Sequence, residues 1–156
     1  MFRFKDYYHN EVHLSFEDYP FSKDPKHVWV ICRYKDKWLL TIHSDRGYEF
    51  PGGKVEHSEN ADDAAIREVK EETGGSVGKL TYIGQYKVLG KEKTIIKNIY
   101  FAEIDKIIPQ TDYLETNGPI LLESLPPDIQ RNRKFSFIMK DDVLVRSLEK
   151  ILEEYI

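Results

Sequence analysis

Three glutamates that fall on one face of a predicted helix are the strongest candidates for chemistry in this sequence. At about 100° per residue, Glu68, Glu71 and Glu72 lie within an arc of roughly 100°. Like charges this close weaken an isolated helix, and the helix dipole opposes negative charge near the carboxyl end. A hard divalent cation such as Mg²⁺ prefers oxygen ligands and offsets both costs. The pattern indicates a metal site, and a solvated charged helix is the alternative.

The helix that carries these glutamates has a predicted beginning, a predicted end and a tight turn before it. Asn60 is placed as its N-cap and Gly74 as a left-handed C-terminal stop. In the turn formed by residues 50–53, Gly52 and Gly53 have no side chain in the way, so the backbone can approach a metal. Arg67 lies one helical turn before Glu71 and can orient the carboxylates.

The rest of the chain alternates between strand patterns and turns, with one further helix at the end. Residues 12–16 alternate apolar and polar side chains, and two antiparallel hairpins are predicted from 27–34 with 38–43 and from 80–89 with 94–104. A short strand is predicted over 120–122, and an amphipathic helix from Asp141 onward. Between them, residues 105–118 are polar and irregular, which favours a mobile loop over a site.

Composition limits the classes of protein to which the chain can belong. With 27 acidic and 23 basic residues the formal charge is −4, which disfavours a groove for duplex DNA. No apolar run is long enough to span a membrane, and the N-terminus does not resemble a signal peptide. The single cysteine, Cys32, lies in an apolar run and is expected to be buried. We expect one domain over residues 1–156 and a cytoplasmic location.

Residues 53–75 carry the pattern G-x5-E-x7-R-E-U-x-E-E-x-G, where U is aliphatic, which resembles the signature of the Nudix hydrolases. Only Gly75 departs from this signature, because the family usually has an aliphatic residue at that position. We expect a slightly altered chain path where the helix ends. The segments HVWVICRY, GQYKVLGKEK and RNRKFSFIMKD are similar to the MutT-type branch, whose members sanitise 8-oxo-dGTP. The resemblance implies an α/β fold, the α/β/α sandwich of the family around a mixed β-sheet.

The resemblance also implies roles for individual residues. Mg²⁺ (or Mn²⁺) would be bound by three carboxylates and one carbonyl: Glu68, Glu71, Glu72 and Gly52. Glu68 would position or deprotonate the attacking water, while Glu59 and Arg67 would orient the helix and its carboxylates. Glu115 would be a second carboxylate supplied from a loop, and a surface glutamate is the alternative for it.

Four further residues are candidates for substrate binding. Arg33 and Lys54 can contact phosphate, although lone basic residues are commonly just solvated. Phe50 resembles an aromatic that flanks the purine in MutT-type enzymes, and a core position suits it equally. Asn132 lies roughly where those enzymes read the base edge with an asparagine.

The reaction implied by the resemblance is hydrolysis of a (deoxy)nucleoside triphosphate to the monophosphate and pyrophosphate, with 8-oxo-dGTP as a candidate substrate. A second possibility is removal of pyrophosphate from the triphosphorylated 5′ end of RNA. A third is a non-catalytic nucleotide-binding module, but such modules typically lose motif glutamates and this chain keeps all of them. ADP-sugar hydrolases tend to have a proline after the motif, and residues 77–106 contain none.

Overall fold

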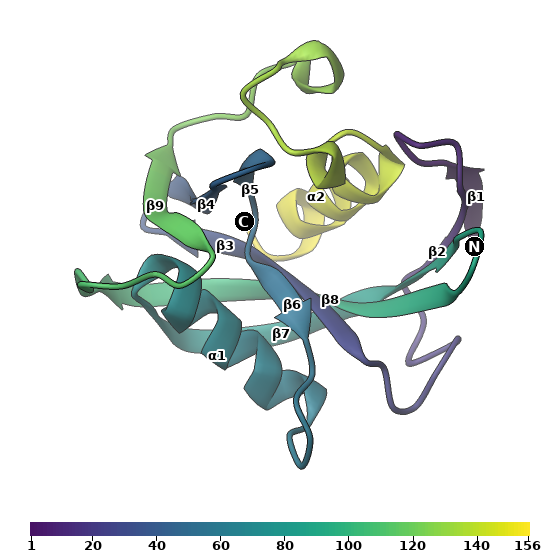
Figure 1. Ribbon diagram of the computed structural model, residues 1–156, viewed down its shortest axis with the longest axis horizontal. Coiled ribbons are helices and arrows are strands. Elements are labelled where there is room, and N and C mark those ends of the chain that lie inside the picture. The colour runs from purple at the N-terminus through teal and green to yellow at the C-terminus, as the bar shows by residue number, and fades with distance from the viewer.

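A mixed sheet of nine strands forms the centre of the molecule, and one α-helix packs on each of its faces (Figure 1). The computed structural model describes residues 1–156. The strands are β1 (Phe2–Lys5), β2 (Glu11–Ser15), β3 (His27–Tyr34), β4 (Lys37–His43), β5 (Gly47–Glu49), β6 (Gly52–Lys54), β7 (Gly75–Leu89), β8 (Thr94–Ile107) and β9 (Thr116–Leu122). The helices are α1 (Ala61–Thr73) and α2 (Asp142–Glu154), with short 3-10 turns η1 (Ile129–Arg131) and η2 (Phe137–Met139).

The strand order confirms both predicted hairpins and the mixed sheet. The main path runs β1-β2-β7-β8-β3-β4-β5, with β6 paired to β3 and β9 paired to β4. Strands β3 and β4, and β7 and β8, pair antiparallel, whereas β3 and β8 pair in parallel. The hairpin strands are longer than predicted. Strand β7 begins at Gly75, directly after α1, and β8 continues to Ile107 as its partner. All nine strands belong to one sheet. That residues 1–156 form one domain stays a prediction.

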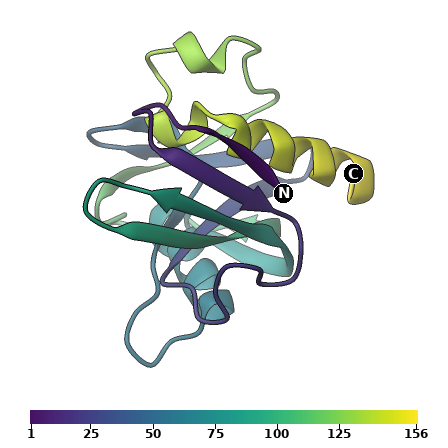
Figure 2. The same cartoon turned by 90° about the vertical axis from the view of Figure 1, so that its right-hand side faces the viewer.

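The two faces of the sheet carry separate hydrophobic cores, so the α/β/α sandwich is confirmed. On one face α2 packs through Val143, Leu144 and Ile151, and on the other α1 packs through Ala64, Ala65 and Val69. Figure 2 shows α2 and α1 on opposite sides of the strands. Neither helix is long and apolar enough to cross a lipid bilayer.

Helix α1 begins and ends as predicted. The Asn60 side chain accepts a 2.8 Å hydrogen bond from the backbone N–H of Asp63, and Gly74 ends the helix in the left-handed region at φ 76°. Ile66, although apolar, lies away from the sheet and is 42% exposed. The sheet-facing side uses small alanines, which allow α1 to approach the strands closely. Gly75, at the departing position of the motif, is already the first residue of β7.

The loop between β8 and β9 is shorter than the irregular region predicted, since the strands extend to Ile107 and from Thr116. It is attached to the carboxyl end of α1: Gln110 Nε2 donates to the Glu71 carbonyl at 3.2 Å, and the Thr116 hydroxyl donates to the Glu72 carbonyl at 3.3 Å. These bonds satisfy helix carbonyls that have no partner within the helix. The loop is thereby fixed beside the predicted metal ligands.

The segment that leads to α2, residues 123–141, includes η1 and η2 and is attached to β5. Tyr48 and Phe135 form an isolated parallel bridge, in which the Tyr48 N–H donates to the Lys134 carbonyl and the Ser136 N–H donates to the Tyr48 carbonyl. Asp141, where the helix was predicted to begin, is the N-cap of α2 and accepts from the Val143 N–H at 2.9 Å.

Candidate active site

A cleft of about 560 Å³ lies where the predicted metal ligands meet the ends of several strands. Its walls are the helix α1, the turn before β6 and β6 itself, the β4–β5 connection, the β8–β9 loop and the start of β3. Of its sixteen lining residues, only two are hydrophobic, so the cleft suits a charged ligand. The sequence predictions that line it include Gly52, Lys54, Arg67, Glu115 and the three helix glutamates.

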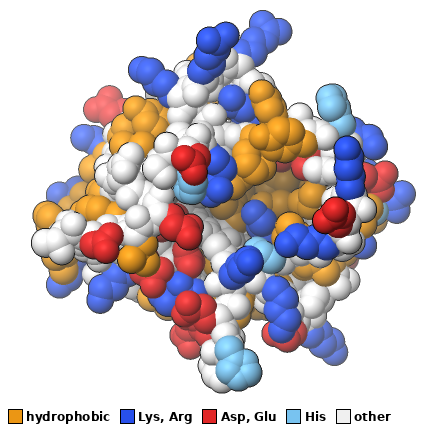
Figure 3. All heavy atoms as spheres, in the orientation of Figure 1, with side chains coloured by type: hydrophobic (Ala, Val, Ile, Leu, Met, Phe, Trp, Pro, Cys, Tyr) orange, Lys and Arg blue, Asp and Glu red, His pale blue; other side chains and the backbone are white.

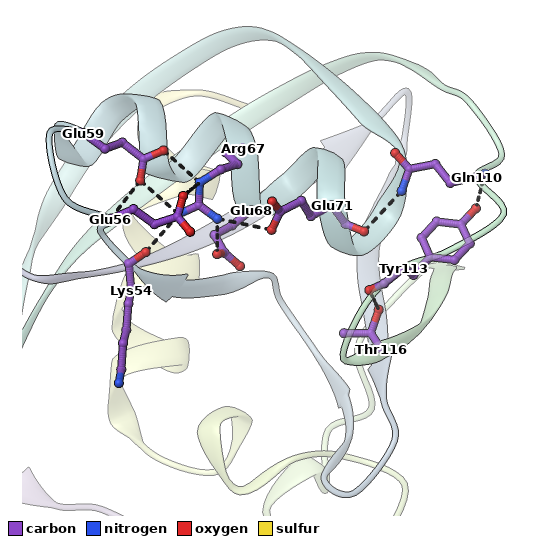
Figure 4. Close-up of polar contacts among 9 residues, drawn as sticks. All are labelled: Lys54, Glu56, Glu59, Arg67, Glu68, Glu71, Gln110, Tyr113 and Thr116. Atoms are coloured by element: carbon purple, nitrogen blue, oxygen red, sulfur yellow. Dashed lines mark hydrogen bonds and ion pairs between the residues drawn. The ribbon is translucent and has the colours of Figure 1, made fainter.

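Arg67 is the centre of the hydrogen bonds around these glutamates (Figure 4). Its Nε donates to Glu59 at 2.8 Å, and its Nη1 donates to Glu68 at 2.7 Å and to Glu71 at 3.2 Å. Its Nη2 donates to the Lys54 carbonyl at 2.9 Å, which ties the helix to β6. These bonds raise the pKa of Arg67 above its ordinary value, and the bond to Arg67 lowers the pKa of Glu59. This geometry supports the orienting role expected for Arg67 and Glu59.

Glu72 is the most buried of the three helix carboxylates. Burial, followed by the hydrogen bond and the negative charge of neighbouring Glu68, raises the pKa of Glu72 to about 10. Glu49, a buried carboxylate on β5, adds to the rise. The pKa of Glu71 is also raised, first by burial and then by Glu68. Negative charge at this end of the cleft is therefore in excess of what Arg67 compensates.

The chemistry of these donors fits a hard divalent cation. All of the predicted donor atoms are oxygens, and no Lys or Arg side chain forms an ion pair with Glu72. The turn also approaches closely, since a Cβ on Gly53 would lie 2.7 Å from a Glu68 carboxylate oxygen. The side chains do not form a preassembled cage in which three of them converge on one point. Arg67 Nη1 lies between Glu68 and Glu71, so these two must turn to share a cation. The ligand set predicted from the sequence stays a prediction.

Several residues of the cleft were not predicted from the sequence, and three of them form one polar group: His43, Arg46 and Glu49. Arg46 forms a two-point ion pair with Glu49, with Nε–Oε1 3.0 Å and Nη2–Oε2 2.9 Å. The His43 Nδ1 accepts from the backbone N–H groups of Asp45 and Arg46, so its other nitrogen, Nε2, carries the proton. The only signal in the sequence was a histidine, an arginine and a glutamate close to the turn at Gly47, without a diagnostic spacing.

Of the four predicted substrate contacts, one lines the cleft and three do not. The two basic residues differ in this respect. Lys54 lines the cleft, although its side chain points away from the glutamates (Figure 4). Arg33 does not reach the cleft. It stacks on Trp38 and borders a separate hollow of about 440 Å³ beside the C-terminus. The strand β3 enters the cleft at His27, and six residues of extended chain place Arg33 about 20 Å away.

The aromatic and amide candidates also lie elsewhere. Phe50 is 1% exposed and packs edge-to-face against Trp29 and Trp38, so it belongs to the core, the alternative given above. Asn132 ends η1, and its side chain accepts from the Lys134 N–H at 3.0 Å, which stabilises the turn. It does not line the cleft. By contrast Glu115 lies on the cleft loop. The pKa of Arg46 is raised first by its hydrogen bond to Glu49, and the charge of Glu115 adds to the rise.

Comparison with known proteins identifies the class of protein that this fold and cleft define. Residues 21–133 match the NUDIX domain, and the chain belongs to the Nudix family of hydrolases. Over 153 residues it is 67% identical to a Bacillus subtilis (strain 168) protein provisionally named 8-oxo-dGTP diphosphatase YtkD, covering 98% of this chain and 97% of that one.

Solved structures agree with this assignment. The E68A mutant of the Bacillus subtilis pyrophosphohydrolase BsRppH superimposes with a TM-score of 0.98 at 65% identity, covering 99% of this chain and 98% of the other. A NUDIX hydrolase from Nitrosomonas europaea shares the fold, with a TM-score of 0.65 at 20% identity over 83% of this chain and 90% of that one. The Nudix fold and the hydrolase class are thereby established.

Replacing Gly53 with alanine should lower kcat of the hydrolase about tenfold or more, because the new Cβ displaces the Glu68 carboxylate. Steady-state hydrolysis measures this effect, and urea unfolding should change by less than about 1 kcal/mol because a side chain, not backbone, moves. Gly78→Ala is the matched control, since its Cβ would displace the Asp105 carboxylate outside the cleft. Equal activity of the two variants would show that the close approach at Gly53 is unimportant.

In metal-free protein, stability should fall as the pH rises from about 5 to 9. The Glu72 carboxyl keeps its proton up to a pKa of about 10 when folded, whereas its ordinary value is 4.5. Between these values the folded state binds more protons, so each pH unit removes up to about 1 kcal/mol. Urea unfolding in EDTA should show this slope, and Glu72→Gln should flatten it. The exposed control Glu103→Gln should keep the wild-type slope. If Glu72→Gln keeps the slope and Glu103→Gln loses it, the assignment to Glu72 is contradicted.

Proposed function

We propose that this Nudix hydrolase converts nucleoside triphosphates to monophosphates and pyrophosphate with Mg²⁺ (or Mn²⁺). The observation that carries the proposal is the charge arrangement of the cleft. Buried acidic groups in excess lie on α1, while Arg46 and Lys54 line other parts of the same cleft. A polyphosphate chain with its divalent cation complements both signs of charge.

The reaction adds water across the bridge between the α- and β-phosphates. The water oxygen bonds to a phosphorus of that bridge, the bridging P–O bond breaks, and one proton is released at neutral pH. Glu68 positions the water and takes up its proton, while Glu71, Glu72 and the Gly52 carbonyl are the other groups proposed to hold the metal. When bound, the metal would neutralise phosphate charge and lower the pKa of the attacking water.

The remaining polar groups of the cleft have roles in binding the phosphates. Arg46 and Lys54 supply positive charge, and the protonated Nε2 of His43 is available as a neutral hydrogen-bond donor. Arg67 is fully engaged with glutamates and the Lys54 carbonyl, so it orients carboxylates and does not bind phosphate. Glu115 is proposed as the additional carboxylate from the loop.

The identity of the base is a separate part of the proposal. The name of the Bacillus subtilis relative makes 8-oxo-dGTP and dGTP the first substrates to test. A cytoplasmic location, where nucleoside triphosphates are abundant, is proposed together with this substrate class.

The experiment is an assay of dGTP, 8-oxo-dGTP, GTP and ATP with Mg²⁺ and with Mn²⁺, in which nucleotide products are separated and pyrophosphate is measured. We expect monophosphate and pyrophosphate in equal amounts. Glu68→Gln should lower kcat about 100-fold or more, because it removes both the group that takes up the proton and an anionic metal ligand. Glu92→Gln, in the exposed β7–β8 turn, is the control. Release of orthophosphate, or no hydrolysis of any triphosphate, would refute the proposal.

A second candidate substrate is the triphosphorylated 5′ end of RNA, and a basic segment beside the cleft favours it. From Ile129 to Lys140 the chain has four basic residues and no acidic residue: Arg131, Arg133, Lys134 and Lys140. The bridge between Tyr48 and Phe135 holds this segment against β5, next to the cleft residue Glu49. In Figure 3 Lys and Arg side chains gather over this part of the viewed face. Such a segment attracts a phosphodiester backbone.

The double variant Arg131→Glu, Arg133→Glu separates the two substrates. It should raise KM for a triphosphorylated ten-nucleotide RNA about tenfold at low salt, because two phosphate contacts become repulsive. KM for a free nucleoside triphosphate should not change, since neither side chain lines the cleft. The effect should diminish at high salt. An RNA that is not hydrolysed, or one that reacts equally well with the variant, would exclude this use of the segment.

A further inference from the structure

Two fully buried amide side chains lie in the sheet, on the face that carries α1. Gln85 on β7 and Asn98 on β8 are cross-strand neighbours, and both are 0% exposed. Side chains alternate along a strand, so Asn98 shares its face with Tyr100, a member of the core beneath α1. Burying a polar side chain costs folding free energy unless its hydrogen bonds are formed. The two amides therefore need a role that apolar side chains could not perform.

The hydrogen bonds of these amides run in one direction, from the segment after β2 to the beginning of α1. The Gln85 Oε1 accepts from two successive backbone N–H groups, the second being that of Ser22, at 3.0 and 3.2 Å. The Gln85 Nε2 donates to the Ser22 carbonyl at 2.7 Å and to the Asn98 Oδ1 at 2.8 Å. The Asn98 Nδ2 donates to the Tyr100 hydroxyl at 3.0 Å, and this hydroxyl donates to the Asp62 Oδ1 at 2.6 Å.

The direction of this buried polar network (Gln85, Asn98, Tyr100 and Asp62) is fixed at its first member. A backbone N–H can only donate, so the Gln85 oxygen must face it, and the orientation of each later group follows from the one before. Asn98 also donates to the Tyr19 hydroxyl at 3.2 Å, which uses the second hydrogen of its amide. Burial and the bond to Asp62 raise the pKa of Tyr100, so its hydroxyl keeps the proton that it donates. A network with all members satisfied is rigid.

Asp62 lies in the first turn of α1, on the side of the helix that faces the sheet. Seven residues, almost two full turns, separate it from Val69, which is buried against the strands. At the other end of α1, the Glu72 carbonyl accepts from the Thr41 hydroxyl on β4 at 2.9 Å. Figure 2 shows the segment after β2 and α1 on the same side of the sheet. Two attachments about 15 Å apart along the axis thus limit the rotation of the helix.

The rotation of α1 determines where its glutamates lie in the cleft. A carboxylate at the surface of a helix lies about 6 Å from the axis, so a rotation of about 10° moves it by about 1 Å. A displacement of this size at the reacting groups can lower the rate about 100-fold. The attachment at Asp62 is independent of Arg67, which binds the glutamates on another side of the helix.

We propose that Tyr100, acting through Asp62, is a positioning residue of the hydrolase that sets the orientation of the acidic face of α1. The buried polar network holds the Tyr100 hydroxyl toward the helix, which an apolar core could not do. The inference rests on the proposed function, in which Glu68, Glu71 and Glu72 bind the metal.

Tyr100→Phe keeps the ring in the core and removes the hydroxyl. Tyr82→Phe is the matched control, because Tyr82 is the cross-strand neighbour of Tyr100 and its hydroxyl donates to the Glu17 carbonyl at 2.7 Å, outside α1. Both variants lose hydrogen bonds and should unfold at lower urea concentrations. Only Tyr100→Phe should lower kcat, by about tenfold, and weaken Mn²⁺ binding to nucleotide-free protein, measured by calorimetry.

Asp62 examines the other end of the same hydrogen bond. Asp62→Ala should lower kcat as much as Tyr100→Phe does, and the double variant should lower it no further, because both changes remove one interaction. Asp62→Asn keeps an acceptor and should restore most of the activity lost in Asp62→Ala. Asp63→Ala, which removes another acidic side chain from the first turn, is the control and should have the kcat of wild type.

Two results would overturn the inference. One is a kcat and a Mn²⁺ affinity in Tyr100→Phe equal to those of Tyr82→Phe, and the other is a double variant whose loss is the product of the two single losses. If wild type hydrolyses no triphosphate, the proposed function fails, and the Mn²⁺ affinities of the two tyrosine variants still decide whether Tyr100 positions the helix.

Discussion

The network around the Arg67 guanidinium holds the acidic part of the molecule together. One positive charge is shared among Glu59, Glu68 and Glu71, and the same group fixes the backbone of β6 through the Lys54 carbonyl. Loop, strand and helix are therefore connected at one point. Because a single cation cannot compensate all of these carboxylates and buried Glu72 as well, the folded state has a strong electrostatic preference for a further positive charge.

The sheet holds the carboxyl end of α1 in place despite this repulsion. The hydroxyls of Thr41 on β4 and Thr116 on β9 both donate to the Glu72 carbonyl, at 2.9 and 3.3 Å. The Ile108 N–H donates to the Gly74 carbonyl just beyond the helix. Free carbonyls at a helix end are negative, and these donors satisfy them without adding a charge. The position of Glu72 is thus fixed by neutral hydrogen bonds from strands distant in sequence.

The sequence predicts what depends on neighbours along the chain. The caps of α1, the hairpins and α2 have local signals, and their positions agree with the structure. The other parts of the cleft depend on strand register, for which one sequence contains no rule. His43, Arg46 and Glu49 reach the cleft because β4 and β5 end there, and Arg33 misses it because it lies at the far end of the correct strand.

Residue type alone was also insufficient where two environments suit the same side chain. Phe50 and Glu49 are neighbours in sequence, yet Phe50 enters the core and Glu49 the cleft. Ile66 is apolar and yet exposed, because the neighbouring alanines, Ala64 and Ala65, occupy the sheet side of α1. In both cases the three-dimensional packing of large and small side chains decided the outcome, and periodicity could not distinguish the alternatives.

Two ionisable groups without an oppositely charged ion-pair partner, Glu72 and Lys97, lie on opposite faces of the sheet. At the acidic end, Glu72 is buried among carboxylates and favours a cation; on the sheet, Lys97 is half-buried without an ion pair and favours an acceptor. They cannot neutralise each other, because Lys97 is held on β8 and Glu72 on α1, which packs against the opposite face of the sheet. A divalent cation would supply the positive charge that the acidic end of the cleft favours. The energetic cost of burying these carboxylates close together would then be offset when the cation binds.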